Sequence, residues 1–87
     1  MPRVEKELVI RNPQGLHARP AALFVQTAAK FDSTVKIKKD DETVDGKSII
    51  GILSLGAECG NKILLIIEGE DAQEACRDLE NVLASNK

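Results

Sequence analysis

The sequence is poor in aromatic residues and contains no long apolar run. Phe24 and Phe31 are its only aromatic side chains. Twelve basic residues stand against fourteen acidic ones, so the chain lacks the basic surface and the stacking platform that nucleic-acid binding needs. No apolar run is longer than the five residues of Ile63 to Ile67, far fewer than the roughly 20 residues of a membrane-spanning helix. We therefore expect no nucleic-acid partner and no insertion into a membrane.

Cysteine and histidine are scarce as well. Cys59 and Cys76 form no CxxC motif, and His17 is the single histidine, so the ligands of a metal site are missing. We expect no metal, no cofactor, and two reduced thiols that behave as small apolar side chains. The first residues, MPRVEKE, lack the apolar segment of a signal peptide, which predicts a cytoplasmic location.

The length and composition predict one globular domain spanning residues 1–87. A chain of 87 residues is too short to build two hydrophobic cores. Its 43% hydrophobic and 30% charged residues are ordinary for a folded domain and argue against a disordered one.

Apolar residues alternate with polar ones in several short segments, which predicts strands. These are residues 4–11, residues 34–38, a short strand around 43–45 that follows the turn at Asp40 and Asp41, and residues 62–68. The last of these carries five apolar residues in a row, as a central strand does.

Three segments show helical spacing. Between residues 18 and 30 small apolar residues recur at intervals of three and four, and Pro20 suits the first turn; they are Ala18, Ala21, Ala22, Val25, Ala28 and Ala29. Ser48 is a predicted N-cap for a short helix that Gly56 closes. Asp71 followed by Glu74 is typical of a capping box before the last helix.

The predicted order is β-α-β-β-α-β-α. Three helices are too few to cover both faces of a four-stranded sheet. We therefore expect an α+β fold in two layers, with the three helices on one face and the other face exposed.

The segment Gly15 to Pro20 carries the candidate chemistry. His17 falls at the predicted N-cap, where the backbone amides of Ala18 and Arg19 are free and the helix dipole is positive. Such a helix end binds phosphate, and the Arg19 guanidinium adds a partner for phosphate oxygens. The alternative is an ordinary solvated histidine. The surrounding residues favour a nucleophilic nitrogen beside an anion site.

The short helix after Ser48 has apolar residues nearly all round it. We assign Ile52 and Leu55 to the core and expect Ile49, Ile50 and Leu53 to be partly exposed, which is typical of a docking surface. The alternative is a more enclosed helix. The Ser48 hydroxyl is either a cap alone or also a phosphate acceptor.

With these segments in place, the chain resembles the HPr family, the small histidine phosphocarriers of the bacterial phosphoenolpyruvate-dependent phosphotransferase system, together with their nitrogen-branch relatives. GLHARPA matches the family's active-site segment, and GKSIIGILSLGA, residues 46–57, matches its regulatory-site segment. The resemblance covers residues 4–85. It implies the HPr-like open-faced β-sandwich with a four-stranded antiparallel sheet.

The resemblance also implies roles for single residues. His17 is implied to accept the phosphoryl group through its δ1 nitrogen, with Arg19 stabilising that group. Ser48 is implied to be the regulatory phosphorylation site of an HPr kinase. Partner docking is assigned to Ala22, Ile49, Ile50 and Leu53.

The implied partners are enzyme I as donor and enzyme IIA proteins as acceptors in sugar transport. HPr kinase/phosphorylase and a transcription regulator are further candidates. We expect a monomer that is a phosphoryl carrier and not a stand-alone enzyme, because one histidine without a carboxylate partner or a cleft cannot turn over a small substrate. A nitrogen-branch regulatory carrier and a ferredoxin-like small-ligand-binding domain are the alternatives.

Overall fold

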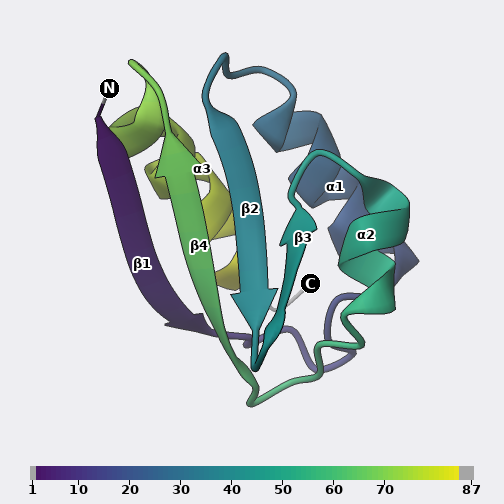
Figure 1. Ribbon diagram of the computed structural model, residues 1–87. Helices are drawn as coiled ribbons and strands as arrows, with labels where there is room; N and C mark the ends of the chain where they lie inside the picture. The colour runs from purple at the N-terminus through teal and green to yellow at the C-terminus, as the bar shows by residue number, and fades with distance from the viewer. Residues whose placement is uncertain (1, 85–87) are drawn as a thin grey trace.

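The computed structural model describes residues 2–84, which form four strands and three helices (Figure 1). In chain order the elements are β1 (Arg3–Val9), α1 (Ala18–Ala28), β2 (Thr34–Lys39), β3 (Glu42–Asp45), α2 (Ile49–Ser54), β4 (Lys62–Glu68) and α3 (Ala72–Ala84). The predicted order is therefore confirmed. The first strand and the first helix each end two residues earlier than expected.

The strands form one antiparallel sheet in the order β1-β4-β2-β3. The apolar run in β4 is thus central, as predicted, between β1 and β2. Alternate residues Ile63, Leu65 and Ile67 are buried against the helices, while Leu64 and Ile66 are half-buried on the opposite face.

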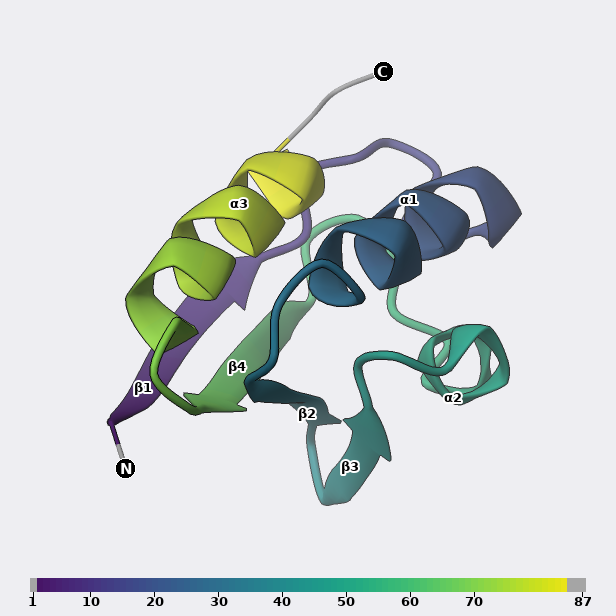
Figure 2. The ribbon, with the colours of Figure 1, turned by 90° about the horizontal axis from the view of Figure 1, so that it is seen from above.

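The helices lie to one side of the sheet (Figure 2). α1 and α3 cover the sheet, and α2 continues their layer beside β3, where Gly51 approaches Val44. The opposite face is uncovered, so the expected two-layer α+β architecture is confirmed. Across residues 2–84, none of the helices has the length and apolarity that crossing a membrane requires.

The buried side of α1 differs from the expected alanine stripe. Its buried residues are Ala21, Phe24, Thr27 and Ala28, whereas Ala18 and Ala29 are exposed. Alanine is a good helix former on either side of a helix, so its spacing alone does not define the buried side. Phe24, fully buried, fixes this side because it has by far the largest apolar surface to bury.

The start of α2 is as predicted. The Ser48 side chain accepts a hydrogen bond from the Gly51 amide at 3.1 Å, and Gly56 follows the helix with a positive φ of 61°. Ile52 and Leu55 are buried, as expected.

The predicted capping box at the start of α3 is wrong. The Asp71 carboxylate instead accepts hydrogen bonds from the amides of Asp32 and Ser33, at 2.9 and 3.0 Å, and from the Ser33 hydroxyl. It therefore ties the start of α3 to the segment that enters β2, a contact between residues far apart in the sequence.

This contact makes stability depend on acid pH. The Ser33 hydroxyl and the Asp32 amide hold the pKa of Asp71 below its ordinary value of 3.8. The unfolded chain lacks these bonds, so their contribution is complete above pH 3.8 and is lost as pH falls through the lowered folded-state pKa. We expect Asp71→Asn to lower the free energy of unfolding at neutral pH and to flatten its decline in acid. Urea titrations across pH measure both effects.

Asp78→Asn is the matched control, since this exposed carboxylate on α3 makes no hydrogen bond or ion pair within residues 2–84. The same acid decline in Asp71→Asn and in the wild type contradicts the assignment.

Candidate functional site

The loop between β1 and α1 is held in place by the segment that leads into β4. The amide of Ile10 donates to the Asn61 carbonyl and the amide of Gly60 donates to the Ile10 carbonyl, both at 2.9 Å. Further along, the Leu16 amide donates to the Ala57 carbonyl at 2.9 Å, and the Leu16 side chain is buried. The loop is therefore anchored on both sides of its turn.

The turn itself is built around Asn12 and Gly15. The Asn12 side-chain oxygen accepts a hydrogen bond from the Gln14 amide, and the Asn12 backbone carbonyl accepts one from the Gly15 amide, each at 2.9 Å. Gly15 adopts a positive φ of 70°. A Cβ there would lie 2.5 Å from the Ala57 carbonyl oxygen, so only glycine allows the two segments to approach this closely.

His17 follows this anchored turn and is the N-cap of α1, as predicted. Its backbone is extended, with φ −81° and ψ −175°, and its carbonyl accepts from the Ala21 amide at 2.9 Å. The imidazole makes no capping hydrogen bond and is exposed. Within residues 2–84 neither ring nitrogen has a hydrogen-bond partner, so both can meet another molecule.

Two backbone amides at this helix start are open as well. Pro20 has no amide hydrogen and the Ala21 amide is used, so the open amides are those of Ala18 and Arg19. Within residues 2–84 neither of them donates to a protein acceptor. The Arg19 guanidinium is exposed and makes no ion pair in the same part of the chain. An anion bound at this helix start has two unused backbone amides as donors, and the Arg19 guanidinium is a third donor group close by in the sequence.

The ring borders a shallow depression of about 280 Å³ that reaches the end of α2. Leu53 and Glu58 line it together with His17. Sequence reasoning did not single out Glu58, because a glutamate in a loop shows no local pattern that ties it to a distant histidine. The depression is open, so a group on the ring remains accessible to another protein.

The expected docking residues lie on two helices that pack against each other, α1 and α2. Ile50 is 79% exposed, Ile49 39% and Leu53 41%, while Ala22 is half-buried. We call these four residues the helix-pair surface. Leu23 of α1 is also exposed, at 48%, and was not predicted, because an alanine-rich helix offers no clear boundary between its two sides.

Comparison with known proteins shows what kind of protein carries this site. Residues 4–85 match the family model described as the PTS HPr component phosphorylation site. The chain belongs to the HPr family.

Relatives and solved structures agree with this assignment. The HPr-like protein Crh of Halalkalibacterium halodurans is 50% identical over 76 residues, which are 87% of this chain and 90% of the relative. The crystal structure of the phosphocarrier protein HPr from Bacillus anthracis superposes with a TM-score of 0.90 at 44% identity, over 93% of this chain and 96% of the other.

Crh of Bacillus subtilis, a catabolite repression protein solved as an intertwined, domain-swapped dimer, has a TM-score of 0.75 and 45% identity, with 92% of each chain covered. The HPr-like fold is thus confirmed, and the alternative of a ferredoxin-like small-ligand-binding domain is wrong.

Ser48 lies apart from His17 on this HPr domain. It caps the first turn of α2, whereas the depression beside His17 borders the end of that helix. Six helical residues span about 9 Å. A phosphate on Ser48 would therefore sit next to Ile49 and Ile50 on the helix-pair surface and not at the imidazole.

The two thiols are free and differ in environment. Cys76 is buried in α3, and burial raises the pKa of its thiol. Cys59 is also free but is exposed. Both thiols are thus unbridged, as expected, and Cys76 is the one that packs in the core. Residues 2–84 contain no cluster of His, Cys, Asp and Glu side chains that could hold a metal ion.

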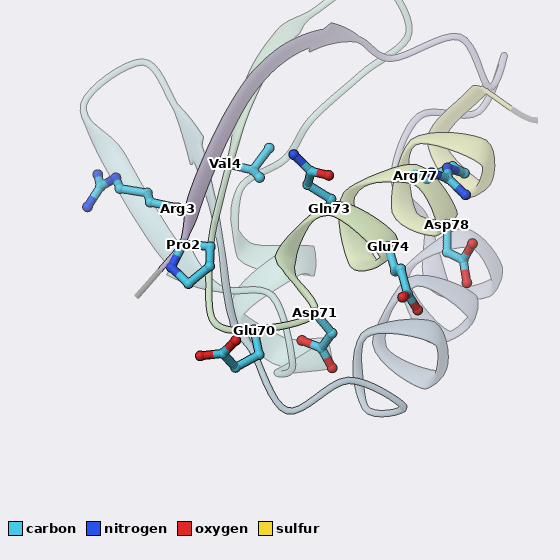
Figure 3. A pocket seen from close by; sticks show the side chains of 9 residues that line it. All are labelled: Pro2, Arg3, Val4, Glu70, Asp71, Gln73, Glu74, Arg77 and Asp78. Atoms are coloured by element: carbon cyan, nitrogen blue, oxygen red, sulfur yellow. The ribbon is translucent and has the colours of Figure 1, made fainter.

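A larger depression of about 670 Å³ lies between the start of β1 and α3, at the other end of the sheet from His17. Charged residues line it, but Figure 3 shows that Arg3 and Arg77 point away from one another. The two guanidinium groups cannot clamp one anion, so this depression does not compete with the His17 site.

The close approach between Gly15 and Ala57 predicts what a side chain at position 15 costs in stability. We expect Gly15→Ala to lower the free energy of unfolding by about 1–3 kcal/mol, because its backbone strain adds to the overlap with Ala57. Gly56→Ala is the control, because Gly56 also has positive φ but has no atom within 4 Å of its added Cβ. Chemical denaturation compares the two, and equal losses contradict the overlap.

Proposed function

We propose that this HPr-family chain accepts a phosphoryl group on His17 from phosphorylated enzyme I and passes it to enzyme IIA proteins of the sugar phosphotransferase system. The single observation that carries the proposal is the exposed His17 imidazole at the start of α1, next to two backbone amides that have no acceptor within residues 2–84. Arg19, two residues further on, adds a guanidinium that makes no ion pair in the same part of the chain. The family match supports a phosphocarrier. The donor, the acceptors and the cytoplasmic location are part of the proposal.

The transfer step forms one N–P bond and breaks another. A neutral imidazole nitrogen of His17 uses its lone pair to form an N–P bond, and the donor's N–P bond breaks, which returns an electron pair to the donor imidazole. The amides of Ala18 and Arg19 and the Arg19 guanidinium face the negative oxygens of the transferred group. The protein contributes position and charge and is regenerated only when an acceptor takes the group, so it acts as a carrier and not as a stand-alone enzyme.

An open site suits a carrier. The phosphoryl group must leave as readily as it arrives, and a shallow depression leaves it accessible to an acceptor's nucleophile. Donor and acceptor would both dock on the helix-pair surface, Ala22, Ile49, Ile50 and Leu53, because it is the exposed apolar area next to the ring. Only one partner binds at a time, and the working form in this exchange is the monomer.

Transfer of labelled phosphate tests the assignment of His17 and Arg19. With labelled phosphoenolpyruvate and enzyme I, we expect acid-labile label on the wild type and none on His17→Gln. Arg19→Ala should slow transfer by about tenfold to a hundredfold, because one stabilising donor is lost. Arg11→Ala, on the preceding loop, is the control and should react at the wild-type rate. Label that persists in His17→Gln contradicts the proposal.

We further propose that phosphorylation of Ser48 by an HPr kinase/phosphorylase weakens docking. A phosphate adds nearly two negative charges at the edge of an apolar surface. A partner that docks there must remove water from these charges, which costs free energy. The cap position tolerates a negative charge because it lies at the positive end of the helix, so the modification can act without unfolding α2.

A charge substitution separates docking from folding at Ser48. Asp and Asn are both good N-caps, so Ser48→Asp and Ser48→Asn keep the helix start and differ only in charge. We expect Ser48→Asp to raise the KM for phosphorylated enzyme I by about tenfold with little change in kcat, and Ser48→Asn to match the wild type. Equal KM values for the two variants count against regulation by charge.

A regulatory carrier is the second candidate. Its support is the similarity to Crh, a catabolite repression protein. Such a carrier uses the same His17 or Ser48 chemistry but delivers its signal by binding a transcription regulator, as a nitrogen-branch carrier does with its own targets. Transfer of label from the phosphorylated chain to an enzyme IIA distinguishes relay from regulation.

A further inference from the structure

The uncovered face of the sheet has an ordered charge pattern that the carrier function does not use. Figure 1 looks onto this face, with α3 behind the strands. Residues that are register partners across the strands lie on the same face. One row across β1, β4 and β2 therefore reads Glu7, Leu64, Lys38, and the next row reads Glu5, Ile66, Lys36.

Each row has an acidic residue on one side, an aliphatic residue in the centre and a basic residue on the other side. The side chains at both ends of each row are exposed, and Leu64 and Ile66 are half-buried. Lys6, the β1 residue between the two glutamates, points the other way and pairs with Glu80 of α3 at 2.9 Å. This pairing confirms that Glu5 and Glu7 face outward.

The charges in the row through Leu64 are not neutralised within the chain. Across two strand spacings Glu7 and Lys38 lie roughly 10 Å apart, with Leu64 between them. Neither residue makes an ion pair within residues 2–84. In the other row Arg3 pairs with Glu5 and Asp45 lies beside Lys36, so the Leu64 row carries most of the unused charge.

We propose that this face associates with a second copy of itself, through a two-fold axis that runs along β4 between the sheets. Such an axis exchanges the β1 and β2 sides. Glu7 of each copy then faces Lys38 of the other, Glu5 faces Lys36, and the Leu64 and Ile66 side chains meet at the centre. The surface is self-complementary, as an isologous interface requires.

The charge pattern selects this occupant and this orientation. A two-fold axis perpendicular to the strands would place acidic residues on acidic ones and basic on basic. Along β4 the sheets pack face to face, with strand directions about 30° apart as in aligned β-sandwiches. The helix-pair surface and His17 lie on the other side of each copy, so the association leaves the carrier site free.

The association is weak and depends on salt. Its apolar centre is small, and Lys62 of each copy lies near the axis, where like charges repel. Ion pairs at an exposed interface are screened by salt. We therefore expect a monomer at the concentrations of a transfer assay. At about 1 mM protein in low salt we expect about half of the chains in dimers, as a dissociation constant near that value gives.

Sedimentation velocity with two charge-reversal variants tests the interface. Glu7→Lys leaves lysine at both ends of the row, and Lys38→Glu leaves glutamate at both ends. Each variant alone should associate at least about tenfold more weakly than the wild type, because both intermolecular pairs become repulsive. An equimolar mixture of the two should recover the wild-type association, because every cross pair in the mixed dimer is again lysine against glutamate.

Several results would overturn the proposal. These are a monomer at every concentration in low salt, a dimer that persists in both single variants, as strand exchange would give, and a mixture that fails to associate. Glu7→Gln and Lys38→Gln repeat the comparison without repulsion and should weaken association less. An unchanged far-ultraviolet circular dichroism spectrum and urea midpoint in all four variants shows that they are folded, so the result does not depend on the proposed carrier function.

Discussion

The arrangement of the site depends on the contact between the Gly15–Leu16 segment and Ala57. The Leu16 amide donates to the Ala57 carbonyl at 2.9 Å, and Gly15 lies so close to that carbonyl that a Cβ would overlap it. Since Leu16 is buried and His17 comes next, this contact determines where the exposed ring stands relative to the start of α1. The histidine is held by its backbone, and its side chain is left free.

This division between a fixed backbone and a free side chain fits the chemistry of a carrier. A ring held by its own hydrogen bonds would have to break them in each transfer, whereas the His17 imidazole has none at the cap. The open amides of Ala18 and Arg19 belong to a helix of 11 residues, so their dipoles are already oriented before a phosphoryl group arrives. The ring also lies beside the end of α2, where Leu53 lines the same depression, so docking and transfer use adjoining surfaces.

Much of this could be predicted from the sequence, because local patterns determine it. The strand alternation, the central position of β4, the Ser48 cap and the position of His17 at a helix start all follow from neighbouring residues. The buried side of α1 was less clear, because alanine does not distinguish a buried from an exposed position. The role of Asp71 was missed because its partner Ser33 lies 38 residues away, and the closeness of Glu58 to His17 arises only when two loops meet.

The central claim is that the start of α1 and Arg19 together hold the phosphoryl group on His17. The most direct measurement follows the amide protons of Ala18 and Arg19 by NMR while the protein is phosphorylated with the chemical donor phosphoramidate, which needs no protein partner. The account predicts downfield shifts and slower hydrogen exchange for these two amides, both absent in His17→Gln. Phosphorylation of His17 that leaves both amide signals in place would contradict it.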